Sequence, residues 1–157
     1  MATKASKAYN LAPVGRVKRA KYGVQLRIDE QFRPGLKHLD KFSHVVVIWW
    51  ADRFDTEEYR SKLQVKPFYA DKVLTGIFAT RSPYRPNPIA VTVCRIVDVD
   101  EEEGVVVVSN IDAYDGTEIL DLKGYFPISD QVADPRIPGW LPEEFARPVP
   151  DEGEGPD

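Results

Sequence analysis

The sequence predicts a mainly β protein, a small antiparallel β-barrel with one or two short helices. Short runs rich in valine, isoleucine and aromatic residues recur along the 157 residues, with brief connections between them. Such runs favour strands, and many short strands with short connections are typical of barrels and folded sheets. No G-x-G-x-x-G motif follows a strand-like run, which argues against a doubly wound dinucleotide-binding fold.

The first half of the chain contains three predicted strands. Residues 43–54 are β-branched and aromatic, which predicts a central strand. Residues 13–20 are the expected partner of a half-buried strand at residues 22–29. Strict alternation in that strand puts four apolar side chains on one face: Tyr22, Val24, Leu26 and Ile28.

Two short segments favour helices. Residues 33–42 place Pro34 in a first helical turn, and their apolar residues recur at helical spacing. Residues 55–63 predict a second short helix or an ordered loop, with Asp55 as its cap and Glu58 as the capping-box partner.

The second half returns to strands. Residues 72–80 predict one strand, and residues 89–100 and 105–112 predict a hairpin that turns at three glutamates and a glycine. A turn at Asp115-Gly116 then leads into a short strand.

Composition narrows the class of protein. No apolar run approaches the roughly eighteen residues that span a membrane, and the N-terminus lacks the apolar block of a secretion signal. One cysteine, Cys94, and two histidines cannot build a conventional zinc site without carboxylates. We therefore expect a cytoplasmic protein that needs no metal and has no membrane segment.

Charge is unevenly spread. The first 27 residues contain seven lysines and arginines and no acidic residue, which suits either phosphate contacts or an ordinary solvated strand face. Residues 147–157 are rich in proline, glycine and acids, so we expect a disordered tail after one domain at residues 1–146.

The connection "RSPYRPNPIA" at residues 81–90 is unusually rigid. It has three prolines and no glycine, and each proline also restricts the residue before it. Arg81 and Arg85 offer planar donor forks suited to carboxylate or phosphate, and Asn87 offers a donor and an acceptor. The loop is either a binding element or a rigid connection whose arginines pair with the chain's own acids.

Two further groups of polar residues stand at predicted strand ends. Asp112 and Asp115 flank a strand end and a turn, where they either bind a ligand or simply shape the turn. Asp52 and Arg53 end the strand that contains the two neighbouring tryptophans. No Ser-His-Asp or Cys-His set is present, which fits a reaction that depends on positioning a reactive cofactor.

Two long motifs resemble the TsaA-like, or TrmO-type, family. They are "GIFATRSPYRPNPIAVTV" and, some twenty residues later, "IDAYDGTEILDLKGYFP". The upstream "GLKHLDKFSHVVVIWW" is also similar to that family, and the likeness covers roughly residues 9–130. The resemblance implies a dimeric β-barrel that binds S-adenosylmethionine and methylates N6 of threonylcarbamoyladenosine at position 37 of transfer RNA.

The resemblance also implies site residues. The implied reaction needs a group that accepts one proton, and Asp115 in the turn is the nearest candidate. Cofactor contacts are expected from the proline loop, the strand end before the turn and, with less uniform motif positions, the end of the tryptophan strand: Arg81, Ser82, Arg85, Asn87, Val91, Ser109, Ile111, Asp112, Gly116, Asp52 and Arg53.

The sequence departs from the family pattern at three motif positions. Ala90 stands where glycine is usual, and Glu118 and Gly124 replace prolines. The P-R-Q segment and the C-terminal domain of longer members are absent from this sequence. Three hypotheses therefore stay open: a transfer RNA methyltransferase, a methyltransferase of a small molecule, and a non-catalytic module that binds S-adenosylmethionine.

Overall fold

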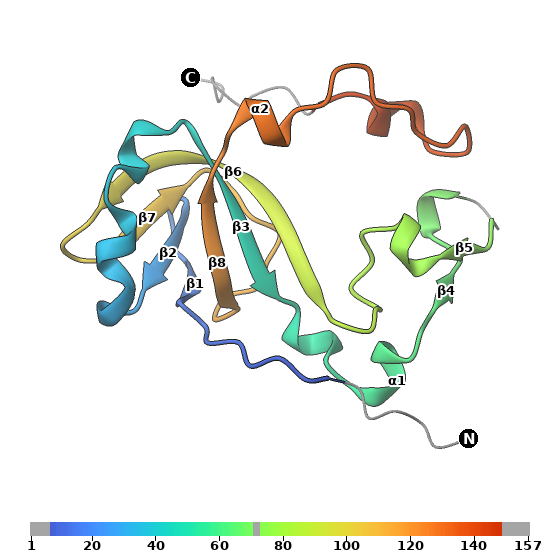
Figure 1. The fold of residues 1–157 in the computed structure, drawn as a ribbon, viewed down its shortest axis with the longest axis horizontal. Helices are drawn as coiled ribbons and strands as arrows, with labels where there is room; N and C mark the ends of the chain where they lie inside the picture. Colours follow the sequence, from blue (N-terminus) through green and yellow to red (C-terminus); the bar gives the residue numbers. More distant parts are fainter. Residues whose placement is uncertain (1–6, 71–72, 149–157) are drawn as a thin grey trace.

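The computed structural model describes residues 7–70 and 73–148, and its centre is a closed antiparallel barrel (Figure 1). The strand order around the barrel is β1-β2-β7-β6-β3-β8. This confirms the predicted fold class. The six strands are β1 (Gly15–Arg19), β2 (Val24–Ile28), β3 (His44–Trp50), β6 (Ile89–Asp100), β7 (Val105–Val108) and β8 (Glu118–Gly124).

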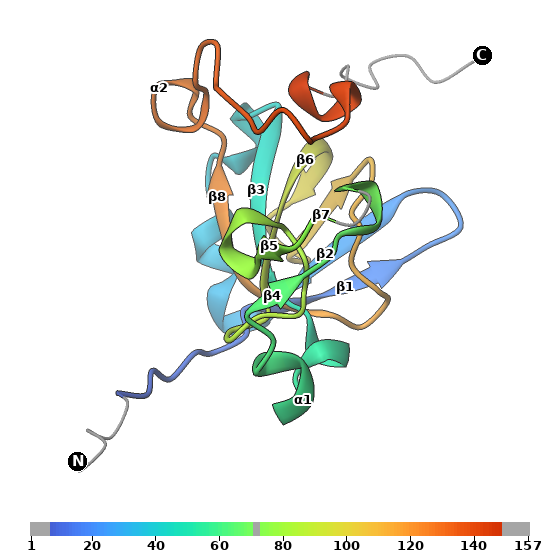
Figure 2. The same cartoon turned by 90° about the vertical axis from the view of Figure 1, so that its right-hand side faces the viewer.

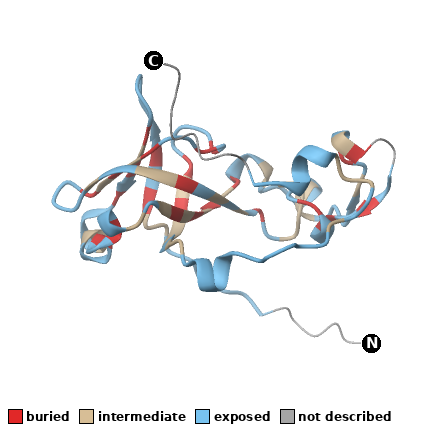
Figure 3. Ribbon diagram, turned by 90° about the horizontal axis from the view of Figure 1, so that it is seen from above, coloured by how far each residue is buried: buried red, intermediate tan, exposed pale blue. Residues whose placement is uncertain are grey.

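Alternating apolar residues fill the barrel. Val17 of β1 lies opposite Leu26 of β2, and Val45 of β3 lies opposite Cys94 of β6; all four side chains are buried. Figure 3 shows the buried residues concentrated in the barrel strands. The predicted inner face of residues 22–29 is confirmed except at Tyr22, which precedes β2 in the hairpin turn and is exposed.

One end of the barrel is covered by two short 3₁₀ helices, η1 (Glu30–Leu36) and η2 (Leu39–Lys41). The single helix predicted over residues 33–42 is therefore wrong in form, although its apolar residues Leu36 and Leu39 are buried as expected. His38 separates the two helices with a φ of 69°, which ordinary helix cannot contain.

The chain segment that connects β3 to β6 forms a small arm to one side of the barrel (Figure 1). It is built from η3 (Asp52–Phe54), α1 (Glu57–Arg60), β4 (Gln64–Val65), η4 (Phe68–Ala70), β5 (Thr75–Gly76) and η5 (Ile77–Ala79). Strands β4 and β5 pair only with each other and take no part in the barrel.

Two local predictions fail in this arm. The strand expected over residues 72–80 is reduced to Thr75–Gly76, because the chain then folds into η5 and Thr80 N donates to the Ile77 carbonyl. Helix α1 is capped by Thr56, whose hydroxyl accepts from Tyr59 N, and Asp55 instead pairs with Arg60.

The C-terminal segment contains α2 (Pro127–Asp130) and η6 (Glu143–Ala146). Phe145 meets Tyr69 of the arm edge to face, with ring centroids 5.1 Å apart. The tail predicted at residues 147–157 lies outside the described residues apart from Arg147 and Pro148. Among the residues that the structure describes, no helix has the length and apolar character needed to cross a bilayer.

Candidate functional site

A cavity of about 220 Å³ opens at the end of the barrel where β3 stops and β6 begins. The proline loop, the end of β3 and the loop before β8 enclose it. Its walls combine an apolar part, with Trp49, Phe54, Pro88 and Ile89, and a charged part. The charged side chains are Asp52, Arg53, Arg81 and Asp112, and the hydroxyl side chains are Ser82, Tyr114 and Thr117. Five of the residues predicted for the site therefore meet in one cavity: Asp52, Arg53, Arg81, Ser82 and Asp112.

The proline loop holds its own shape through internal hydrogen bonds. Ser82 N donates to the Thr80 hydroxyl at 3.2 Å, and Tyr84 N donates to the Ser82 hydroxyl at 3.2 Å. Arg85 Nη1 donates to the carbonyl oxygens of Thr80 and Ser82, at 3.2 and 3.0 Å. Arg85 thus braces the loop, and Arg81 is the arginine of the pair that lines the cavity.

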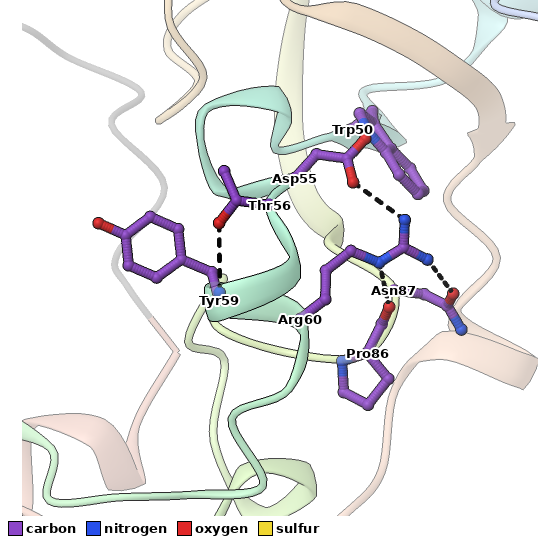
Figure 4. A network of polar contacts seen from close by, with 7 residues as sticks. All are labelled: Trp50, Asp55, Thr56, Tyr59, Arg60, Pro86 and Asn87. Atoms are coloured by element: carbon purple, nitrogen blue, oxygen red, sulfur yellow. Dashed lines mark hydrogen bonds and ion pairs between the residues drawn. The ribbon is translucent and has the colours of Figure 1, made fainter.

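Arg60, which the sequence analysis did not single out, fixes the other side of the loop (Figure 4). Its guanidinium donates to the Pro86 carbonyl at 2.7 Å, to Asn87 Oδ1 at 3.3 Å and to Asp55 Oδ1 at 2.9 Å. Asp55 also accepts from the Trp50 indole at 3.2 Å. The side chain of Asn87 is therefore a hydrogen-bond acceptor in this network.

Asp112 is oriented by two residues that the sequence analysis did not assign to the site. Its Oδ1 accepts from the Thr92 hydroxyl at 2.6 Å, and that hydroxyl accepts from Trp49 Nε1 at 3.0 Å. Thr92 projects from β6 next to the cavity rim, and Trp49 is buried at the end of β3. The chain of hydrogen bonds holds one carboxylate oxygen of Asp112 and fixes its direction.

Three aromatic residues line the cavity: Trp49, Phe54 and Tyr114. The guanidinium carbon of Arg53 lies 3.6 Å from the centroid of the Tyr114 ring, a close cation–π contact between two cavity-lining residues. Tyr84 of the proline loop packs against Phe54 and Tyr59, with ring centroids 5.2 and 4.9 Å apart.

The other predicted site residues lie away from the cavity lining. Ile111 is buried in the core and Val91 is on the outer face of β6. Asp115 Oδ1 accepts from Arg19 N at 2.8 Å, and its role as proton acceptor stays a prediction. The last two predicted residues, Ser109 and Gly116, make backbone hydrogen bonds. Ser109 N donates to the Arg95 carbonyl, and Gly116 N donates to the Val17 carbonyl from a backbone with a φ of 82°.

Cys94 lies inside the barrel beneath Asp112. Burial, with a smaller effect of the Asp112 charge, raises the pKa of the Cys94 thiol to about 12, so it carries no nucleophilic thiolate at neutral pH. Within residues 7–70 and 73–148, no group of three His, Cys, Asp or Glu residues is arranged to hold a metal ion. The polar chemistry of the cavity rests on its arginines, carboxylates and hydroxyls.

Residues 7–131 match the family model of the tRNA-methyltransferase O N-terminal domain, and the chain belongs to this family. A relative from Pyrococcus horikoshii named "Probable S-adenosyl-L-methionine-binding protein PH1056" is 38% identical over 117 residues, which cover 74% of this chain and 82% of the relative. A mouse protein named "tRNA (adenine(37)-N6)-methyltransferase" is 39% identical over 90 residues, which cover 57% of this chain and 20% of the mouse protein.

Solved structures agree with the fold. A "Crystal structure of TrmO" has a TM-score of 0.66 at 27% identity and matches 85% of this chain and 62% of that chain. TrmO from Pseudomonas aeruginosa gives a TM-score of 0.61 at 26% identity, with 83% and 62% covered. An Archaeoglobus fulgidus protein named as a probable S-adenosyl-L-methionine-binding protein is 38% identical over 79% of this chain but only 32% of its own length. The chain thus spans only part of several relatives.

Proposed function

We propose that this chain is an S-adenosylmethionine-dependent methyltransferase that acts on N6 of threonylcarbamoyladenosine at position 37 of transfer RNA. The observation that carries the proposal is the meeting of the two family motifs at one cavity, with Arg81 and Ser82 from the first and Asp112 from the second. The family match and the name of the mouse relative support N6-methylation of the adenine at position 37 of transfer RNA.

The cavity residues suit the chemical parts of S-adenosylmethionine. The apolar wall formed by Trp49, Pro88 and Ile89 fits a purine, and a carboxylate such as Asp112 fits an ammonium group or ribose hydroxyl. The Arg81 guanidinium fits a carboxylate, either of the cofactor or of the threonyl group of the substrate. Arg85 and Asn87 would support binding indirectly, by keeping the loop rigid before the ligand arrives.

When bound, S-adenosylmethionine supplies a methyl group on a sulfonium, which is already a good leaving group. The residues of the chain then have two tasks. They align the acceptor nitrogen with that methyl group, and they accept one proton from that nitrogen. We propose Asp115 as the proton acceptor, and Asp52 and Asp112 are the carboxylates that line the cavity itself.

We propose that the enzyme is a homodimer that works in the cytoplasm. Odd-numbered residues of β6 from Ile89 to Val97 turn outward, and Val93 and Val97 are 52% and 62% exposed beside Ile89 and Val91. This apolar row suits burial against a second copy. The cavity volume of about 220 Å³ is below the roughly 300–1,000 Å³ of most ligand pockets, so a partner subunit that completes the site would account for both features.

Calorimetry and methyl transfer test the proposal in turn. We expect S-adenosylmethionine to bind the parent protein, and labelled methyl to enter transfer RNA that carries the threonylcarbamoyl group but not transfer RNA that lacks it. Incorporation only into small metabolites would replace the RNA acceptor with a small molecule. Absence of cofactor binding would remove the basis of the proposal.

A second candidate function is a non-catalytic module that binds S-adenosylmethionine. The names of the archaeal relatives at 37–39% identity favour it, because they state binding and no reaction. Cofactor binding without methyl transfer to any modified transfer RNA would support this candidate.

Light scattering tests the proposed dimer. The parent protein should show a mass near twice 17.8 kDa, and Val93→Glu should reduce the mass to that of one chain.

A further inference from the structure

The β1–β2 hairpin concentrates positive charge on one part of an acidic protein. Residues 15–28 include five lysines and arginines and no acid. The whole chain has 21 basic and 25 acidic residues, so the 143 residues outside the hairpin hold 16 basic against 25 acidic ones. A polyanion that approaches this protein is therefore attracted mainly to the hairpin.

The strand register turns these charges outward. Val17 and Leu26 point into the barrel, so their neighbours Arg16, Lys18 and Arg27 lie on the solvent side. Arg16 is directly opposite Arg27, an arrangement of like charges that weakens a sheet. Glu118 of β8 compensates Arg16 through an ion pair at 3.0 Å, but the ion pairs of the described residues do not include Lys18 or Lys21.

An aromatic residue stands at the tip of the hairpin. Tyr22 is 83% exposed, and Lys21 Nζ lies 5.3 Å from the centroid of its ring. The turn is closed by a hydrogen bond from Ala20 N to the Gly23 carbonyl, and Gly23 has the positive φ that the turn needs. Figure 2 shows the hairpin projecting from the barrel.

Arg19 fastens this tip to the wall of the proposed active site. Its guanidinium donates to the Ala113 carbonyl at 2.6 Å and to the Ile111 carbonyl at 2.5 Å, and its backbone N–H donates to Asp115. The same loop carries Asp112 and Tyr114, which line the cavity. The basic tip and the cavity therefore share one loop and lie on adjoining surfaces.

We propose that the tip of the β1–β2 hairpin, defined as Lys18, Lys21 and Tyr22 and anchored by Arg19, is a docking surface for the single-stranded loop of an RNA. The cationic side chains bind phosphates, and the exposed tyrosine stacks on an unpaired base. This inference rests on the proposed function, because it gives an RNA substrate a path from the hairpin to the cavity. One exposed tyrosine offers little apolar surface to a lipid bilayer, which favours RNA over a membrane surface.

The test is fluorescence anisotropy with a labelled synthetic anticodon stem-loop, measured over a series of salt concentrations on the full chain. We expect Lys18→Gln/Lys21→Gln to weaken binding about tenfold and to reduce the salt slope by roughly 1.4, since each single-strand phosphate contact contributes about 0.7. Tyr22→Ala should weaken binding about tenfold through lost stacking and should leave the salt slope unchanged.

Three controls make the result specific. Lys18→Arg/Lys21→Arg keeps the charge and should retain parental affinity. Lys37→Gln/Lys41→Gln removes the same charge at the opposite end of the barrel and should change the affinity less than twofold. All variants should bind S-adenosylmethionine as the parent does, which shows that the cavity is intact.

The outcomes separate the two proposals. If the parent binds the stem-loop and the hairpin variants bind it equally well, the docking surface is wrong and the proposed function stands. If the parent binds S-adenosylmethionine but no RNA, both the RNA acceptor and the docking surface are wrong. Equally tight binding to phosphatidylserine vesicles would also overturn the inference, because the surface would then respond to charge alone.

Discussion

The two ends of the barrel each carry a cavity, and the larger one is the less equipped for chemistry. The cavity beside η1 and η2 has a volume of about 410 Å³, against about 220 Å³ at the proposed active site. Its lining is mostly apolar, with side chains such as Phe32, Leu36, Leu39 and Phe42, and its charged or titratable residues are Lys37, His38 and Asp121. The smaller cavity brings together two arginines and two aspartates from three separate segments.

The comparison of the two cavities indicates that polar side chains from several segments identify the functional site better than cavity volume does. The larger cavity is a rim where the 3₁₀ helices only partly cover the core. Gly124, one of the departures from the family pattern, lies there against Phe42, whose ring would be 2.9 Å from an added Cβ. Glycine in place of the family's proline therefore affects side-chain packing at the end of the barrel covered by η1 and η2.

The largest expected effect is on stability, at the end away from the proposed site. Gly15 pairs with Ile28 and Ile119 where the barrel closes, and a Cβ there would collide with the Arg27 carbonyl oxygen. We expect Gly15→Ala to lower the free energy of unfolding by about 3 kcal/mol in urea titration. Gly35→Ala, at a position with open space around an added Cβ, is the matched control and should stay within about 0.5 kcal/mol of the parent.

The next effect is on ligand affinity at the smaller cavity. Arg81→Ala and Asp112→Asn each remove a charged partner, so we expect S-adenosylmethionine to bind at least tenfold more weakly, equivalent to about 1.5–3 kcal/mol. Asp121→Asn removes a carboxylate that lines the larger cavity and pairs with Lys123, and it should leave the affinity unchanged. An equal loss for Asp121→Asn in calorimetry would mean that the two ends are not functionally distinct.

The pH dependence of the free energy of unfolding at Cys94 measures how well the barrel interior between the two ends excludes water. Well below pH 9, the ordinary pKa of the thiol, Cys94 is protonated in both the folded and the unfolded chain. Above pH 9 the unfolded thiol ionises first, because the folded pKa is about 12, so stability falls as pH rises by at most about 1.4 kcal/mol per pH unit. Urea unfolding at pH 8 and pH 10 measures this slope, and Cys94→Ala should be less sensitive by that amount.

A smaller effect is expected from the hydrogen bonds behind Asp112. Thr92→Val removes the bond to Asp112 Oδ1 and the acceptor of Trp49 Nε1, so S-adenosylmethionine should bind about fivefold more weakly, equivalent to about 1 kcal/mol. Thr92→Ser keeps the hydroxyl and should bind within twofold of the parent. If both variants bind equally well, Thr92 does not position Asp112.

The smallest effect concerns Ala90, where the family usually has glycine. Its methyl group lines the smaller cavity, and the residue pairs with Trp49 in the sheet. Ala90→Gly should lower the free energy of unfolding by about 0.5–1 kcal/mol and change the affinity for S-adenosylmethionine less than twofold. A larger gain in affinity would show that the methyl group restricts the cavity.

Periodic segments were predicted well and aperiodic ones poorly. The alternation at residues 22–29 and the hairpin of β6 and β7 follow directly from side-chain pattern, since each strand buries one face in the same barrel. The strand predicted over residues 72–80 is equally apolar, but the described part, residues 73–80, belongs to the arm, where Phe78 is exposed. Hydrophobicity alone therefore predicted the wrong element.

The fold class, the family and most of the polar groups at the cavity could be predicted from the sequence, because strand alternation and two long motifs are local properties. Which motif residues face the cavity depends on how the barrel and its loops fold together. Arg81 and Arg85 are four residues apart in one loop, yet one lines the cavity and the other bonds loop carbonyls. Thr92, Trp49 and Arg60 gain their roles from partners on other segments, and that proximity exists only once the barrel has closed.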